Sequence, residues 1–186
     1  MKKKTVLLHV CCAPCSISVV DALREEGYEV TGVFFNPNIH PLREYLARRD
    51  SMKQLAEKAD LPVLWADDGY NLTDWLAMVS DTPQYGARCK LCYTQRLSYT
   101  QKLAEEHGFD YFSTSLLYST KQLHELLAQV GTSVENAQTP FLYKDFRPLW
   151  KEGIERAIEE EFYRQSYCGC VYSENERYHK KLEKLL

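Results

Sequence analysis

Short apolar runs alternate with longer amphipathic segments along most of the chain. Each run is rich in aliphatic or aromatic residues and ends near proline, glycine, asparagine or aspartate, a pattern typical of buried strands. We predict strands at residues 6–10, 29–35, 62–66 and 111–117. Between them, apolar residues recur at helical spacing. We predict helices at residues 16–26, 41–56, 72–78, 92–107, 120–130, 150–163 and 173–186.

This alternation of strands and helices indicates an α/β fold with a doubly wound parallel sheet of about four to five strands. The 186 residues are enough for one domain with a substantial core. We therefore expect a single domain over 1–186, in which residues 141–186 form a helical extension packed on the sheet. The charged tail is expected to be a docked terminal helix with a solvated outer face.

The net charge and the short lengths of the apolar segments limit where the protein can act and what it can bind. The chain has 23 basic and 26 acidic residues, a formal charge of −3, so binding to nucleic acid would need a local basic patch. The apolar part of the N-terminus is short for a signal peptide, and we find no long apolar span. We expect a cytoplasmic protein without a membrane partner. In a reducing compartment, its seven cysteines favour metal ligation or transient redox chemistry over structural disulfides.

The cysteines fall into three groups, at Cys11-Cys12-Ala13-Pro14-Cys15, Cys89-Lys90-Leu91-Cys92 and Cys168-Gly169-Cys170. The first group follows a predicted buried strand, and open α/β sheets place their sites at the carboxyl ends of such strands. Thiolates are soft ligands suited to zinc, copper(I) or iron–sulfur clusters. Adjacent cysteines are unlike the spaced pairs of structural zinc sites, which favours iron. Cys15 is either a ligand or a residue that lines the pocket.

The third group has a different character. A disulfide between Cys168 and Cys170 would be strained and readily reduced, which suits an electron relay. The same pair could instead hold a second metal ion beside Asp67, Asp68 or a thiol of the first group. Two buried thiols in a loop would be the simplest alternative.

The loop after the first predicted strand bears on ATP chemistry. Sheets of this type often bind phosphates there through the backbone amides of a glycine-rich loop. Here the loop carries thiols and Pro14, which lacks an amide hydrogen. We therefore expect no adenylation.

Three segments together resemble the cobalamin-independent epoxyqueuosine reductases, and the similarity runs nearly end to end. They are Leu8-His9-Val10-Cys11-Cys12-Ala13-Pro14-Cys15, Arg88-Cys89-Lys90-Leu91-Cys92-Tyr93 with Arg96-Leu97, and Tyr163-Arg164-Gln165-Ser166-Tyr167-Cys168-Gly169-Cys170. The resemblance implies a fold related to the PP-loop ATPases. It also implies reduction of epoxyqueuosine to queuosine at the wobble position of tRNA, a two-electron removal of an epoxide oxygen.

The same resemblance implies the cofactors and their ligands. It assigns Cys11, Cys12, Cys89 and Cys92 to a [4Fe-4S] cluster, and it assigns Cys168 with Cys170 to a redox pair or a second, mononuclear iron. No cobalamin is expected. The electrons are expected to come from an external donor such as a ferredoxin or flavodoxin.

The sequence identifies residues for proton transfer and tRNA binding less specifically than it identifies the cysteine groups. Asp67, Asp145, His9 and Tyr167 are hypothetical proton donors, and we retain Asp67 as a catalytic candidate beside Cys168 and Cys170. A histidine inside an apolar strand is more often a core residue with satisfied nitrogens, and Asp67 could merely cap the next segment. For tRNA binding we select four residues, Arg88, Arg96, Arg147 and Tyr93.

Two other functions fit parts of the pattern. A PP-loop thiolase that uses an iron–sulfur cluster would bind ATP, which the missing glycine loop disfavours. A non-catalytic, zinc-stabilised RNA-binding module would be colourless and free of iron.

Overall fold

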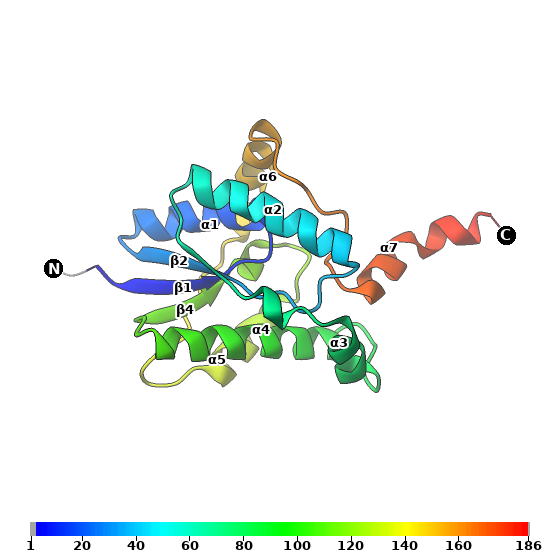
Figure 1. Cartoon of the computed structure of the whole chain (residues 1–186), viewed down its shortest axis with the longest axis horizontal. Coiled ribbons are helices and arrows are strands. Elements are labelled where there is room, and N and C mark those ends of the chain that lie inside the picture. Colours follow the sequence, from blue (N-terminus) through cyan, green and yellow to red (C-terminus); the bar gives the residue numbers. More distant parts are fainter. Residues whose placement is uncertain (1–2, 186) are drawn as a thin grey trace.

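A parallel sheet forms the centre of the computed structural model, which describes residues 3–185 (Figure 1). Its strands are β1 (Thr5–His9), β2 (Glu29–Phe34), β3 (Val63–Trp65) and β4 (Tyr111–Thr114). Within the described residues their order is β3-β2-β1-β4, and every pairing is parallel. In β1, Leu7 lies opposite Thr31 of β2 and Phe112 of β4. The prediction of a parallel sheet of four to five strands is confirmed.

Helices cover both faces of this sheet, as expected for doubly wound strands (Figure 1). They are α1 (Ala13–Glu25), α2 (Leu42–Lys58), α3 (Leu72–Val79), α4 (Ala87–Glu106), α5 (His124–Val134), α6 (Trp150–Glu159) and α7 (Val171–Glu183). α1 packs against α2 and α6 on one face, while α4 packs against β1, β4 and α5 on the other. In residues 3–185, every helix is too short or too polar to span a membrane.

The connection after β1 matters most for the site. β1 is central, with β2 on one side and β4 on the other, so the order of the strands reverses beside it. In open α/β sheets the crevice at such a reversal, beyond the carboxyl ends of the strands, is where ligands bind. The first three cysteines lie at this end of β1.

Two helices begin earlier than their apolar pattern predicts, and both shifts place thiols. α1 begins at Ala13 with Cys12 as its N-cap residue, because Pro14 is well tolerated in a first helical turn. The Ser16 hydroxyl is therefore not a cap and donates to the Cys12 carbonyl at 2.8 Å instead. α4 begins at Ala87, after Gly86 with a φ of 92°. Cys89 and Cys92 thus lie one turn apart on a helix.

The C-terminal part differs in detail from the expectation. α6 packs on α1 and is preceded by the 3-10 turn Arg147–Leu149. Two further 3-10 turns, Asp67–Gly69 after β3 and Ser115–Tyr118 after β4, lie at the carboxyl ends of strands. α7 contains no buried residue and extends away from the sheet (Figure 1). Its first turns contact the body, and the side chains from residue 179 to 185 are exposed. Docking of the terminal helix is therefore confined to its start, and Leu186 lies outside the described residues.

Candidate metal centre

Three thiols meet at the turn between β1 and α1. The Sγ atoms of Cys11, Cys12 and Cys15 all lie within 4.8 Å of one another, and those of Cys11 and Cys12 are 3.7 Å apart. All three residues are buried. Cys12 caps α1 and Cys15 lies one turn further on, so the helix start itself brings the sulfurs together. Soft donors at this spacing suit a thiophilic metal, and Cys15 belongs to the set.

These three thiols share negative charge. Hydrogen bonds from Cys12 and Cys15 hold the pKa of the Cys11 thiol well below its usual value. The same hydrogen bonds raise the pKa of Cys15, and burial raises the pKa of Cys12. One thiolate on Cys11, stabilised by two neutral thiols, is therefore the favoured charge state of the metal-free set.

The other four thiols come from α4 and from the segment that precedes α7, and we call them the second set. Among the described residues no three of their sulfurs lie within 4.8 Å of one another, and neither Cys89 nor Cys92 joins the first three at that distance. Cys89 and Cys92 come from the helix, whereas Cys168 and Cys170 come from the loop. Burial raises the pKa of Cys89, and raises that of Cys92 to about 12. In each case, the neighbouring sulfurs of the set raise the pKa further by charge repulsion. Cys89 and Cys92 are thus neutral thiols in the metal-free protein, and a bound cation would release their protons.

A cavity of about 520 Å³ borders both sets. Cys11 and Cys15 of the first set and Cys168 of the second all line it. Its wall also carries an indole, amides and two cations at the surface, contributed by Trp150, Gln122, Gln165, Lys121 and Arg177. Thiols from the two ends of the chain therefore converge on one hollow.

Side-chain amides are directed at the sulfurs. Gln165 Nε2 donates to Cys12 Sγ at 3.0 Å and to Cys15 Sγ at 3.3 Å. Asn38 Nδ2 donates to Cys92 Sγ at 3.1 Å. Such donors stabilise thiolate charge and tune metal–sulfur centres. Sequence reasoning missed both residues, although Asn38 lies just after a predicted strand and Gln165 stands near Cys168.

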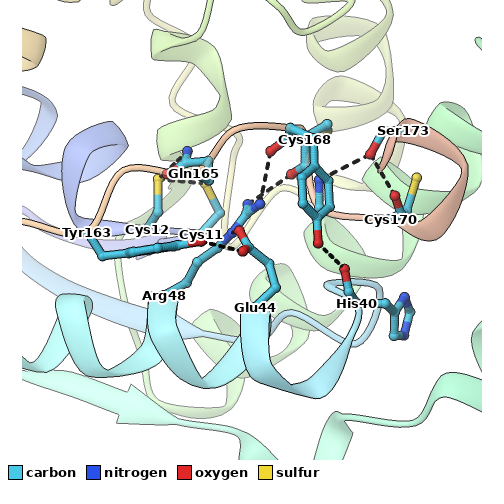
Figure 2. Close-up of polar contacts among 12 residues, drawn as sticks. Cys11, Cys12, His40, Glu44, Arg48, Tyr163, Gln165, Cys168, Cys170 and Ser173 are labelled. Carbon is cyan, nitrogen blue, oxygen red and sulfur yellow. Dashed lines mark hydrogen bonds and ion pairs between the residues drawn. The ribbon is translucent and has the colours of Figure 1, made fainter. Parts of the chain in front are cut away.

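A buried clamp fixes the segment that carries Cys168 (Figure 2). Arg48 of α2, 1% exposed, donates to the carbonyls of Tyr167 and Cys168 at 2.9 Å each. Its Nε donates to Glu44 Oε1 at 2.7 Å, and Glu44 also accepts the Tyr163 hydroxyl. Arg48 is thus an internal residue that holds the loop in place.

Gly169 is required within that segment. Its φ is +139°, and a Cβ there would lie 3.2 Å from Ile39 Cγ1 and 3.3 Å from Arg48 Nη1. The Gly169 carbonyl accepts from the His40 amide at 2.8 Å, and the Tyr167 hydroxyl donates to the His40 carbonyl. Cys168 and Cys170 are both free thiols here. Their role as a redox pair or as ligands stays a prediction.

The predicted substrate residues do not gather at the cavity. Arg88, Arg96 and Tyr93 are 3%, 3% and 2% exposed, and each has an internal partner. Arg88 pairs with Glu176 at 2.6 Å, and the Tyr93 hydroxyl donates to Gln122 at 2.7 Å. Arg96 Nε donates to Asn38 Oδ1 at 2.9 Å, and Arg147 pairs with Asp145 at 2.6 Å.

Asp67 also lies outside the cavity lining. It pairs with Arg49 and accepts the Tyr45 hydroxyl at 2.7 Å. Arg49 holds the pKa of this carboxyl below its usual value, which disfavours proton donation. Its catalytic role stays a prediction.

His9 is a core histidine, as its place in an apolar strand indicates. Nε2 donates to the Phe35 carbonyl at 3.1 Å, and Nδ1 is 2.9 Å from the Thr114 hydroxyl. Burial lowers the pKa of His9 to about 3, so the ring is neutral. Its two hydrogen bonds connect β1 to β4 and to the end of β2.

Comparison with known proteins gives concordant matches. Residues 6–176 match the family model described as epoxyqueuosine reductase QueH. An epoxyqueuosine reductase QueH from Histophilus somni is 38% identical over 175 residues, covering 90% of this chain and 71% of the relative. One from Dehalococcoides mccartyi is 33% identical over 176 residues, with 94% and 95% covered.

A solved structure is similar in fold. The U34-tRNA thiolase NcsA from Methanococcus maripaludis, determined with its [4Fe-4S] cluster, aligns with a TM-score of 0.57 and 17% identity. The alignment covers 100% of this chain and 68% of the thiolase. At this identity the likeness establishes a shared α/β framework.

Proposed function

The chain belongs to the epoxyqueuosine reductase QueH family, and from this premise we propose that it reduces epoxyqueuosine to queuosine in tRNA. The observation that carries the proposal is the cavity bordered by thiols of both sets. An oxidoreductase of this kind needs a reductant held beside the substrate, and seven cysteines in two sets supply the ligands for one.

The reaction consumes two electrons and two protons. The two carbon–oxygen bonds of the epoxide break, a carbon–carbon double bond forms, and the oxygen leaves as water. We propose a [4Fe-4S] cluster on Cys11, Cys12, Cys89 and Cys92, which supplies electrons when bound. Cys15 is close enough to share in the first end of this site. Cys168 and Cys170 then provide a redox pair or hold a second iron.

The cavity has the size and lining that a flipped base needs. About 520 Å³ is within the range of pockets for small ligands. Trp150 offers a flat surface on which a base can stack, and Gln122 offers an amide for its edge. Lys121 and Arg177 line the same cavity and can contact the flanking phosphates. We propose that these residues, rather than the buried Arg88, bind the anticodon at the site.

The electron donor and the setting belong to the same proposal. An external donor such as a ferredoxin or flavodoxin would deliver electrons one at a time, and tRNA as substrate places the reaction in the cytoplasm. Arg147 is 43% exposed and remains available to RNA despite its pair with Asp145.

The test is anaerobic reconstitution with iron and sulfide, followed by reaction with epoxyqueuosine-containing tRNA under a strong reductant, without cobalamin. Mass analysis of the nucleosides should show loss of one oxygen. Cys11→Ser should abolish this loss, and omission of iron should do the same. Sulfur gained in an ATP-dependent reaction would show a thiolase instead. A colourless protein that holds zinc and no iron would show an RNA-binding module.

A further inference from the structure

Arg96 is a buried cation that has no carboxylate partner in the part of the chain that the structure describes. Three arginines of the described chain, Arg48, Arg88 and Arg96, are 3% exposed or less. Arg48 pairs with Glu44 and Arg88 pairs with Glu176. Within residues 3–185, no carboxylate oxygen lies within 4.0 Å of the Arg96 guanidinium. A buried charge left unpaired is strongly unfavourable, so this position calls for negative charge from another source.

The hydrogen bonds of Arg96 point to that source. Its Nε donates to Asn38 Oδ1 at 2.9 Å, and a second guanidinium nitrogen donates to the same oxygen. Because an arginine has no acceptor, the Asn38 oxygen must face it. The Asn38 amide nitrogen consequently faces Cys92 Sγ, to which it donates at 3.1 Å. The positive charge is thus connected to a sulfur of the second set through one polarised amide.

We propose that Arg96, oriented by Asn38, is the built-in counter-cation of the sulfur pocket and raises the reduction potential of the centre that the thiols hold. This inference rests on the proposed function, because it requires a metal–sulfur centre. A fixed positive charge stabilises the reduced, more negative state of such a centre more than the oxidised state. Arg96 is accordingly a positioning residue and not a contact to tRNA.

Arg96→Met tests the charge while keeping a long side chain. In the iron-loaded protein, the potential should become more negative by about 59 mV or more, a tenfold lower ratio of reduced to oxidised centre at fixed potential for a one-electron couple. Arg96→Lys, which keeps the charge, should restore most of this loss. Asn38→Asp should reproduce it, because a carboxylate would neutralise Arg96 and cannot donate to Cys92.

Thermal unfolding gives a second readout that does not depend on activity. In the metal-free protein, Arg96→Met should unfold at the wild-type temperature or above it, because an unpaired buried charge is removed. Its gain in Tm on loading with iron should be smaller than that of the wild type. A residue with only a packing role would lower Tm equally in both states, and that result would overturn the proposal.

Lys102→Met is the control, because Lys102 is a cation of the same helix that is 75% exposed and paired with Glu106. It should shift the potential much less than Arg96→Met, and an equal shift would contradict the inference. If Arg96→Met folds but takes up no iron, the need for the cation is supported directly. If the wild type itself takes up no iron, the proposed function fails, which is distinct from an unchanged potential in a loaded variant.

Discussion

Individual side-chain amides in this protein donate hydrogen bonds to cysteine sulfurs. Gln165 donates one amide group to two thiols, Cys12 and Cys15, from a loop far along the chain. Hydrogen bonds of this kind orient ligands and stabilise their charged form. The side chain of a single residue thereby ties the C-terminal loop to the turn after β1.

Gln165→Glu should weaken retention of iron. The substitution keeps the shape, removes the N–H donor and places a negative charge beside thiolates. We expect about tenfold faster release of iron to a chelator, in line with other losses of ligand-supporting contacts. Gln54→Glu, the same change at an exposed position on α2, is the control and should release iron at the wild-type rate. Equal rates for both variants would exclude the role assigned to Gln165.

At the scale of elements, α2 carries two adjacent arginines in opposite environments, and one of them holds the Cys168 loop. Arg48 is buried, pairs with Glu44 and binds two loop carbonyls. Arg49 faces outward, where its partner Asp67 is 38% exposed. Only the first arrangement joins the helix to the site.

Arg48→Leu should destabilise the metal-free protein by about 3–5 kcal/mol, because it leaves the Glu44 carboxylate buried without its cation. Arg49→Leu should cost about 0–1 kcal/mol, since its ion pair is partly solvated. Urea unfolding of both variants measures the difference. Comparable losses from the two substitutions would show that the clamp does not depend on the buried pair.

The sequence predicts these elements well and their assembly less well. Apolar runs and proline or glycine at their ends are local signals, which is why β1, β2, β3 and β4 were all predicted. The early starts of α1 and α4 depend on Pro14 in the first turn of α1 and on Gly86 at positive φ, which hydrophobic periodicity does not report. Burial of Arg96 on a helix with many polar residues depends on tertiary packing, so its selection for tRNA binding rested on residue type alone.

For the whole molecule, buried neutral histidines couple stability to pH. Burial lowers the pKa of His9 to about 3 and that of His40 to about 4. An unfolded histidine titrates near 6.5, so between that pH and about 4 the unfolded state binds protons that the folded state does not. The free energy of unfolding should therefore fall as the pH decreases through this window.

His40→Phe should reduce this acid sensitivity. The His40 ring is fully buried, and neither ring nitrogen has a hydrogen-bond partner among the described residues. Denaturant unfolding of the metal-free protein at pH 7 and pH 5 should show a smaller decrease for the variant than for the wild type. His107→Phe, at the exposed end of α4, should retain the wild-type decrease. An unchanged decrease in His40→Phe would show that other groups cause the acid loss.

The grouping of thiols is likewise a property of the whole molecule. Spacing identifies three short groups of cysteines, but only the fold shows that Cys15 joins Cys11 and Cys12. It also brings Cys168 to a cavity shared with Cys11, across most of the chain. The framework and the cysteine positions could thus be predicted, whereas the amides and cations around the sulfurs could not.

The course of α7 has one further consequence. Cys170 is the residue from which this 13-residue helix starts, so the helix extends about 20 Å from a thiol of the second set. Even a slight rotation of the 168–170 backbone would be magnified into a readily detected displacement at the far end of the helix. A fluorescent or spin label at Lys184 would then report from the outside whether the interior has taken up metal.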